Sequence, residues 1–246
     1  AALVAAAAGA KVAKHGNRAV TSKCGSADVL EALGIAVVLP PELAVESLRT
    51  AGFMFLYAPA LHPAMKRVLP VRQALGFRTI FNLAGPLTNP AGAPAQIMGV
   101  FAPDRVSLVA ETMVRLGIRH AFVVHGSDGL DELTITGPSH VAEVRGVGGG
   151  WQASQIVPED AGLSRAPLAE LTGGESASEN AAIQEGIFAG EHGPKRDIVL
   201  LNAAAALVAG SIAKDLREGV ARAAEAIDSG AVQDTVKKLR AFAHKI

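Results

Sequence analysis

The fold is decided by residues 12–34, which read VAKHGNRAVTSKCGSADVLEALG. The apolar start of this stretch is typical of a strand, and its end has the spacing of an amphipathic helix. The loop between them concentrates basic side chains, glycines and hydroxyl groups. Glycine lets the backbone approach a ligand closely, and the unpaired amides that open a helix favour anions. From composition alone, the loop fits either an anion site or a solvated connection.

Beyond this stretch, short apolar runs alternate with helical patterns, which predicts an α/β fold with a largely parallel central sheet flanked by helices. The predicted strands are 12–15, 36–39, 53–57, 96–101 and 120–125. The predicted helices are 1–8, 26–33, 41–50, 104–116, 176–188, 197–212, 215–229 and 231–243. The stretch 132–157 predicts a small antiparallel excursion with a glycine-rich turn at 146–150, where no lysine follows as it would in a P-loop.

The composition excludes several classes of protein. The 246 residues carry 23 basic and 23 acidic side chains, a balance that argues against a general nucleic-acid binder. A single cysteine, Cys24, excludes an intrachain disulfide and fits a reducing compartment. We find no membrane-spanning pattern, and residues 1–13 lack the basic start of a signal peptide. We therefore expect a cytoplasmic protein without nucleic-acid or membrane partners.

Two adjacent carboxylates, Asp131 and Glu132, follow the predicted strand 120–125. Hard oxygen ligands in a loop after a parallel strand suit Mg²⁺ that is held jointly with substrate phosphates. An ordinary Asp-Gly turn with exposed acids explains the same residues, so both interpretations stay open at this level. The histidines show no zinc-binding spacing, and no serine has the context of a nucleophile.

The words KHGNRAVTSKCGSADVLEALG (14–34), HPAMKRVLPVRQALGFRTIFNLAGPLTNP (62–90), HGSDGLDEL (125–133) and KRDIVLLNAAAALVAG (195–210) resemble the anthranilate phosphoribosyltransferase family, in order and nearly end to end. The resemblance implies a fold like that of nucleoside phosphorylases and class II phosphoribosyltransferases. It implies an enzyme of tryptophan synthesis that transfers the phosphoribosyl group of phosphoribosyl diphosphate to the amine of anthranilate and releases diphosphate. It also implies Mg²⁺ as cofactor and a homodimer for the complete protein.

The resemblance also assigns residues to the two substrates and to the metal. It implies no general base, because the aromatic amine of anthranilate is already neutral near pH 7. The implied metal ligands are Asp131 and Glu132. The implied anthranilate contacts are Asn17, Arg72, His62 and Pro86. The implied phosphoribosyl-diphosphate contacts are Lys14, His15, Gly16, Asn17, Arg18, Ala19, Val20, Thr21, Ser22 and Ser26.

Within the family pattern, residues 1–56 and 91–246 are expected to form the phosphoribosyl-diphosphate-binding α/β domain. Residues 57–90 are expected to be a helical segment of a separate, mostly missing helical domain, which leaves apolar surface exposed. The family's glycine-rich GTGGD-type loop is absent from this sequence. We therefore interpret the chain as a C-terminal fragment with little activity of its own.

Two alternatives belong to other classes. A pyrimidine nucleoside phosphorylase shares the fold, but its phosphate loop differs from KHGNR and it does not need the acidic pair. A non-catalytic homologue that binds nucleic acid predicts a basic face and loss of the acidic pair, whereas this chain is neutral and keeps both acids.

Overall fold

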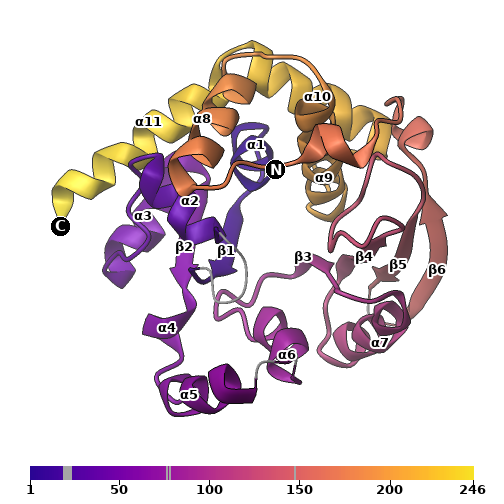
Figure 1. The fold of residues 1–246 in the computed structure, drawn as a ribbon, viewed down its shortest axis with the longest axis horizontal. Coiled ribbons are helices and arrows are strands. Elements are labelled where there is room, and N and C mark those ends of the chain that lie inside the picture. Colours follow the sequence, from indigo (N-terminus) through magenta and orange to yellow (C-terminus); the bar gives the residue numbers. More distant parts are fainter. Residues whose placement is uncertain (19–23, 76, 78, 147) are drawn as a thin grey trace.

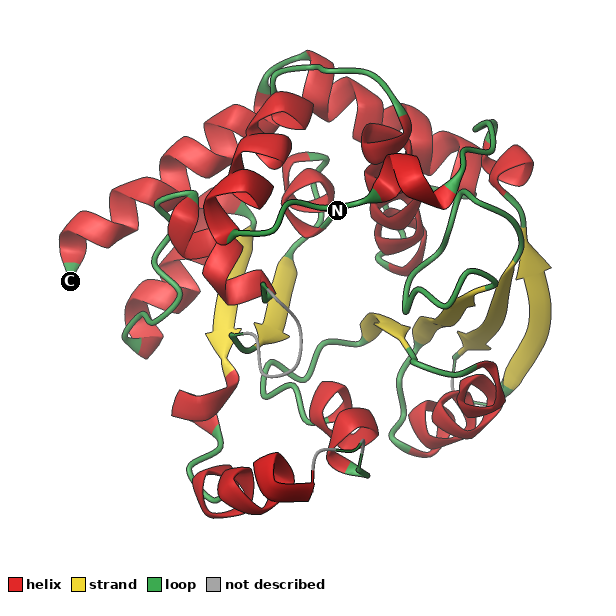
Figure 2. Ribbon diagram, in the orientation of Figure 1, coloured by secondary structure: helices red, strands yellow, loops and turns green. Residues whose placement is uncertain are grey.

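The computed structural model of the protein describes residues 1–18, 24–75, 77, 79–146 and 148–246. Four of the predicted substrate contacts, Ala19, Val20, Thr21 and Ser22, lie outside the described residues. Within the described part, strands and helices alternate as the sequence predicts, and the α/β class is confirmed (Figure 2).

The N-terminal part is built around two parallel strands. Helix α1 (Ala2–Ala7) leads into β1 (Val12–Gly16), which pairs with β2 (Phe53–Tyr57) so that Lys14 lies opposite Phe55. Between the strands run α2 (Ser26–Ala32) and α3 (Pro41–Ala51). Helix α3 ends at Gly52, whose left-handed φ of 74° turns the chain directly into β2.

A second sheet has the order β3-β4-β5-β6. Its parallel pair is β3 (Ala95–Gly99) with β4 (His120–Gly126), joined through the short η1 (Pro103–Arg105) and helix α7 (Val106–Arg115). Strands β5 (Ser139–Arg145) and β6 (Trp151–Ile156) then add in antiparallel fashion. The antiparallel excursion expected for 132–157 is thereby confirmed.

Four C-terminal helices form an arc over both sheets (Figure 1). They are α8 (Ala177–Phe188), α9 (Pro194–Ala209), α10 (Leu216–Asp228) and α11 (Ala231–Arg240), with the short turns η2 (Pro158–Ala161), η3 (Leu168–Leu171) and η4 (Ala241–Lys245) around them. Helix α9 is the central one, because it packs against α1, α10, β3 and β4. It therefore links the strand that carries Lys14 to the sheet that carries the acidic pair. None of the described helices is long and apolar enough to cross a bilayer.

Helices α4 (Ala58–Leu61), α5 (Met65–Leu75) and α6 (Phe81–Leu87) lie on the side of β1 and β2 that faces away from the arc (Figure 1). Apolar side chains are exposed here: Val71 by 58%, Phe77 by 65% and Ile80 by 68%. Such a surface is expected where a segment lacks packing partners. The assignment of residues 57–90 to a separate domain stays a prediction.

Two expectations about the strands differ from the structure. Residues 36–39 form a bend and make no strand ladder, although Ile35 and Val37 are buried. Pro40 and Pro41 follow at once, have no N–H to donate and begin α3, so the apolar residues enter the core without pairing. Within the described residues the strands also form two sheets, of two and four strands, in place of one central sheet. Periodicity marks strands but does not specify their neighbours.

Candidate functional site

The end of β1 and the start of α2 lie against each other because Gly16 has no side chain. A Cβ at Gly16 would lie 3.0 Å from the Phe55 ring and 3.2 Å from the Ser26 hydroxyl. The turn is closed by Asp28, whose carboxylate accepts a hydrogen bond of 2.8 Å from the Gly25 N–H. The end of β1, with Lys14, His15 and Gly16, thus lies beside Ser26, and the role of these residues in binding a substrate stays a prediction.

Arg18 lies beside this turn and already has acidic partners. Its guanidinium donates to both carboxylate oxygens of Glu31, at 3.2 Å and 2.5 Å, and lies 5.4 Å from the centre of the Tyr57 ring. The hydrogen bonds and charge of Glu31 raise the pKa of Arg18. Asn17 accepts from the Arg18 N–H at 2.8 Å. Arg18 therefore has to exchange Glu31 for a phosphate if it is to bind one.

The acidic pair lies in a tightly fixed loop between β4 and β5. Asp128 accepts from the Leu130 N–H at 3.1 Å and from the hydroxyls of Thr134 and Thr136 at 2.5 Å and 2.8 Å. These contacts, with burial opposing them, lower the pKa of Asp128. The side chains of Asp131 and Glu132 are exposed, whereas Leu133 is fully buried.

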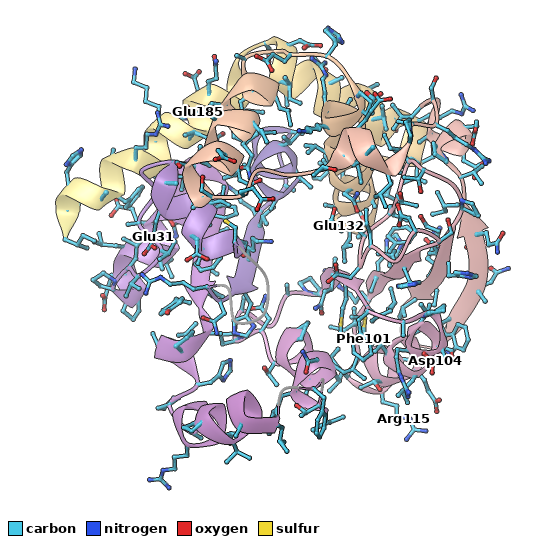
Figure 3. The ribbon with its side chains drawn as sticks, viewed as in Figure 1. Glu31, Phe101, Asp104, Arg115, Glu132 and Glu185 are labelled. Carbon is cyan, nitrogen blue, oxygen red and sulfur yellow. The ribbon has the colours of Figure 1, made fainter. Side chains whose placement is uncertain are left out.

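The backbone of Asp131 passes directly over the last residue of β3. A Cβ at Gly99 would overlap the Asp131 carbonyl oxygen, so no larger residue fits there without moving the loop. Together with the Asp128 contacts, this close approach determines where the two carboxylates emerge. In Figure 3, Glu132 lies below α9 on the side of the second sheet that faces β1.

Lys14 and Glu132 influence each other electrostatically across the two sheets. Burial lowers the pKa of Lys14, and the charge of Glu132 partly offsets this effect. Burial likewise raises the pKa of Glu132, as does the like charge of Asp131, while the charge of Lys14 lowers it. Both side chains keep access to solvent although protein crowds around them. The basic and acidic elements therefore face a common region.

The chemistry of this acidic pair fits a divalent cation that is shared with a ligand. Among the described residues no three histidine, cysteine, aspartate or glutamate side chains gather as a metal cage. Two adjacent carboxylates, one of them with a raised pKa, carry negative charge that the protein compensates incompletely. Mg²⁺ is commonly held by one or two carboxylates together with water and substrate phosphates. Asp131 and Glu132 are the residues that could hold it here.

The structure brings one predicted anthranilate contact beside β1. The Nε2 atoms of His15 and His62 lie 3.1 Å apart, and the two rings meet edge to face at 73°. Burial and the neighbouring charge of His62 lower the pKa of His15, while a backbone hydrogen bond with Gly85 raises it. Asn89 also ties the end of the helical segment to β1, through a 2.9 Å hydrogen bond to the Ala13 carbonyl.

Two further predicted anthranilate contacts, Pro86 and Arg72, are less defined than His62 and Asn17. Pro86 lies within α6, and its carbonyl accepts a 2.9 Å hydrogen bond from Gln96 at the edge of the second sheet. Arg72 lies within α5, but its side chain is outside the described part of the chain.

Two residues near the acidic pair were missed by sequence reasoning. Asn202 is a polar residue in the otherwise apolar stretch 198–213, and its amide pairs with the backbone of Leu133. A buried asparagine within an otherwise apolar helix is the signal that could have revealed it. Gly99 gave no signal, because its importance depends on a loop from elsewhere in the chain.

Comparison with known proteins gives a consistent result. The family model described as the a/b domain of the glycosyl transferase family matches residues 1–233. The chain is 53% identical over 246 residues to an anthranilate phosphoribosyltransferase of Symbiobacterium thermophilum, covering 100% of this chain and 71% of that protein. It is 53% identical over 244 residues to the enzyme of that name from a Geobacter species, covering 99% and 68%.

Solved structures are similar over the same extent. The anthranilate phosphoribosyltransferase of Thermus thermophilus superposes with a TM-score of 0.91 at 49% identity, covering 99% of this chain and 71% of that one. The Saccharomyces cerevisiae enzyme in complex with PRPP and Mg gives a TM-score of 0.89 at 27% identity, covering 100% and 69%. Its complex with 4-fluoroanthranilate gives a TM-score of 0.86 at 25% identity, covering 100% and 68%.

Proposed function

This chain belongs to the anthranilate phosphoribosyltransferases of the glycosyl transferase family, and on that basis we propose which of its residues hold the donor, the metal and the acceptor. In the reaction of this family, the amine of anthranilate displaces diphosphate from the anomeric carbon of phosphoribosyl diphosphate. Negative charge accumulates on the departing diphosphate while the sugar becomes cation-like. The protein therefore has to position two substrates and to stabilise a polyanion.

The observation that carries the proposal is the electrostatic interaction between Lys14 and Glu132. Lys14 lies within the parallel strand β1, and the carboxylate pair lies in the loop that follows β4. A bound diphosphate–metal unit needs a basic and an acidic element that face a common region in this way. We assign the phosphates of the donor to Lys14 and the turn that follows it, including Asn17, Arg18 and Ser26. The ammonium of Lys14 opposes the charge that develops on the leaving group.

Asp131 and Glu132 are assigned to Mg²⁺, which the yeast relative binds together with PRPP. When bound, the ion neutralises charge on the diphosphate. A cation at this place would relieve the repulsion between the two carboxylates, which is one of the causes that raise the pKa of Glu132. Lys14 opposes the same repulsion in the absence of the ion.

Asn17, His62, Arg72 and Pro86 are assigned to the acceptor, and His15 is assigned to the donor. A 4-fluoroanthranilate complex exists for the yeast relative. A planar guanidinium suits a carboxylate, which is the task we assign to Arg72. The contact between His15 and His62 joins the acceptor side to the strand that carries Lys14. Because the aromatic amine is neutral near pH 7, the reaction needs no strong general base.

The test is the phosphoribosyl-diphosphate-dependent loss of anthranilate fluorescence, followed with the protein at its natural full length. We expect turnover that requires both the donor and Mg²⁺. Asp131→Asn is expected to raise the Mg²⁺ concentration needed for half-maximal rate by about ten-fold or more. Asp104→Asn, an exposed aspartate paired with its neighbour Arg105, is the matched control. Absence of donor-dependent turnover, or an unchanged metal requirement in Asp131→Asn, refutes the assignment.

A further inference from the structure

We propose that Asn202 is a positioning residue that fixes the acidic pair through the backbone of Leu133. This inference rests on the proposed function, because it concerns how the carboxylates of Asp131 and Glu132 are held for a metal. Asn202 lies in the middle of α9 and is only 7% exposed. Its side chain reaches across to the residue that directly follows Glu132.

The geometry of the contact is specific to an amide. The Leu133 N–H donates to Oδ1 of Asn202 at 3.1 Å, and Nδ2 of Asn202 donates to the Leu133 carbonyl at 2.8 Å. The second hydrogen of Nδ2 goes to the Ile198 carbonyl, one turn earlier in α9, at 3.0 Å. This position needs a side chain of the length of asparagine that both accepts and donates hydrogen bonds. A leucine side chain does neither, and an aspartate carboxylate only accepts.

Leu133 is fully buried, so its backbone groups depend on a protein partner. Asn202 supplies a partner for the N–H and another for the carbonyl. On the other side of the pair, the Leu130 carbonyl accepts from the Gly126 N–H at 2.8 Å, and the Leu130 N–H donates to Asp128. The two metal-ligand candidates are thus held between two fixed residues, and Asn202 provides the fixed point on the C-terminal side.

Helix α9 is well placed for this role because it also packs against α1, the helix that leads into β1 and Lys14. One helix is therefore connected both to the strand that carries Lys14 and to the loop that carries the acidic pair. Residues that orient metal ligands from outside the coordination sphere commonly change metal affinity about 10- to 100-fold when they are replaced.

The chain contains a matched control. Asn180 in α8 makes the same three hydrogen bonds: from the Gly174 N–H at 3.0 Å, to the Gly174 carbonyl at 3.0 Å and to the Ser176 carbonyl, one turn earlier, at 2.9 Å. It fixes a loop that carries no proposed ligand. Replacing Asn180 removes an equivalent set of hydrogen bonds without touching the acidic pair.

The experiment compares Asn202→Leu and Asn202→Ser with Asn180→Leu and Asn180→Ser in the full chain. Mn²⁺ binding is measured by electron paramagnetic resonance in the presence of phosphoribosyl diphosphate, with a protein-free blank. We expect the Kd for Mn²⁺ to rise about ten-fold or more in the Asn202 variants and to stay unchanged in the Asn180 variants. The Mg²⁺ activation constant is expected to rise in parallel, with little change in the KM for anthranilate.

Other outcomes overturn the proposal in distinguishable ways. If the wild type binds neither Mn²⁺ nor the donor, the proposed function itself fails. If the wild type binds both and folded Asn202 variants bind Mn²⁺ equally well, only the positioning role fails. If both Asn202 variants unfold while the Asn180 variants stay folded, Asn202 supports the whole fold and has no specific effect on the pair. The serine variants leave room for water, which favours a folded protein.

Discussion

The imidazole rings of His15 and His62 meet with their Nε2 atoms 3.1 Å apart, which joins strand β1 to the segment that follows α4. At this distance one Nε2 donates a hydrogen bond and the other accepts it, so a single hydrogen lies between the two nitrogens. A positive charge on one ring disfavours a positive charge on the other. Burial and the charge of His62 together lower the pKa of His15 from its ordinary value of 6.5. The contact therefore makes the site sensitive to acid.

The sign of this effect follows from the lowered pKa. Below about pH 6.5 the unfolded chain protonates His15 more readily than the folded protein does, so the free energy of unfolding falls as the pH decreases. We predict that His62→Gln raises the pKa of His15 and makes this decrease less steep. Imidazole ¹⁵N NMR titration measures the pKa, with His140→Gln, an exposed position on β5, as control. A His15 pKa that is the same in wild type and His62→Gln contradicts the contact.

Glu132 is predicted to destabilise the protein when no metal is present. Burial raises its pKa above 4.5, so ionisation of Glu132 costs more free energy in the folded protein than in the unfolded chain. The cost is absent well below pH 4.5, where the group is protonated in both states, and it grows as the pH rises through the folded pKa. Glu132→Gln therefore raises the melting temperature at pH 7 without metal. A lower melting temperature at pH 7, measured by calorimetry, opposes this account.

Gly99→Ala is predicted to displace the acidic pair. The new methyl group would overlap the Asp131 carbonyl oxygen, so the loop has to move. Overpacking of this kind costs about 1–3 kcal/mol, and we expect the Mg²⁺ requirement of the reaction to rise as well.

Gly186→Ala in α8 serves as the control for this glycine. The atoms nearest to a Cβ there belong to the flexible carboxylate of Glu191, and alanine is favoured over glycine within a helix by about 0.5–1 kcal/mol. Urea unfolding and metal titration of both variants separate the two effects. Equal stability of Gly99→Ala and wild type would show that the loop does not rest on β3.

Arg72→Ala is predicted to raise the KM for anthranilate far more than the KM for phosphoribosyl diphosphate. The physical reason is loss of a bidentate partner for the acceptor's carboxylate, a charge-assisted contact worth about 1.5–3 kcal/mol. Arg67→Ala, in the same helix with an exposed side chain, is the control. Steady-state kinetics with each substrate varied in turn gives both constants. Equal increases in the two KM values would assign Arg72 a structural role.

Local patterns were enough to predict the elements that form the phosphate side of the site. The sequence predicts strands 12–15 and 53–57 and helix 26–33 within a few residues of β1, β2 and α2, because short apolar runs and capping residues act locally. The same reasoning failed at 36–39, where burial of Ile35 and Val37 comes without pairing. The facing positions of Lys14 and Glu132 were expected only from the resemblance to a family.

Contacts between distant parts of the chain could not be predicted from periodicity. His15 and His62 are 47 residues apart, and their meeting depends on how α4 leaves β2. Asn202 and Leu133 are 69 residues apart, and the role of the asparagine appears only once α9 is packed on the second sheet. Gly99 acquires its importance from the Asp131 backbone in the same way. All three contacts are determined by tertiary packing, and local sequence patterns do not reveal it.

The central claim is that Lys14 and the acidic pair act on one metal-bound polyanion. Calorimetric titration with phosphoribosyl diphosphate, with and without Mg²⁺, tests it in wild type, Lys14→Met and Asp131→Asn. Because linkage is reciprocal, the account predicts that Mg²⁺ tightens donor binding in the wild type, that Asp131→Asn abolishes this enhancement, and that Lys14→Met weakens donor binding under both conditions. Donor affinity that is independent of Mg²⁺ in the wild type, or unchanged in Lys14→Met, would contradict it.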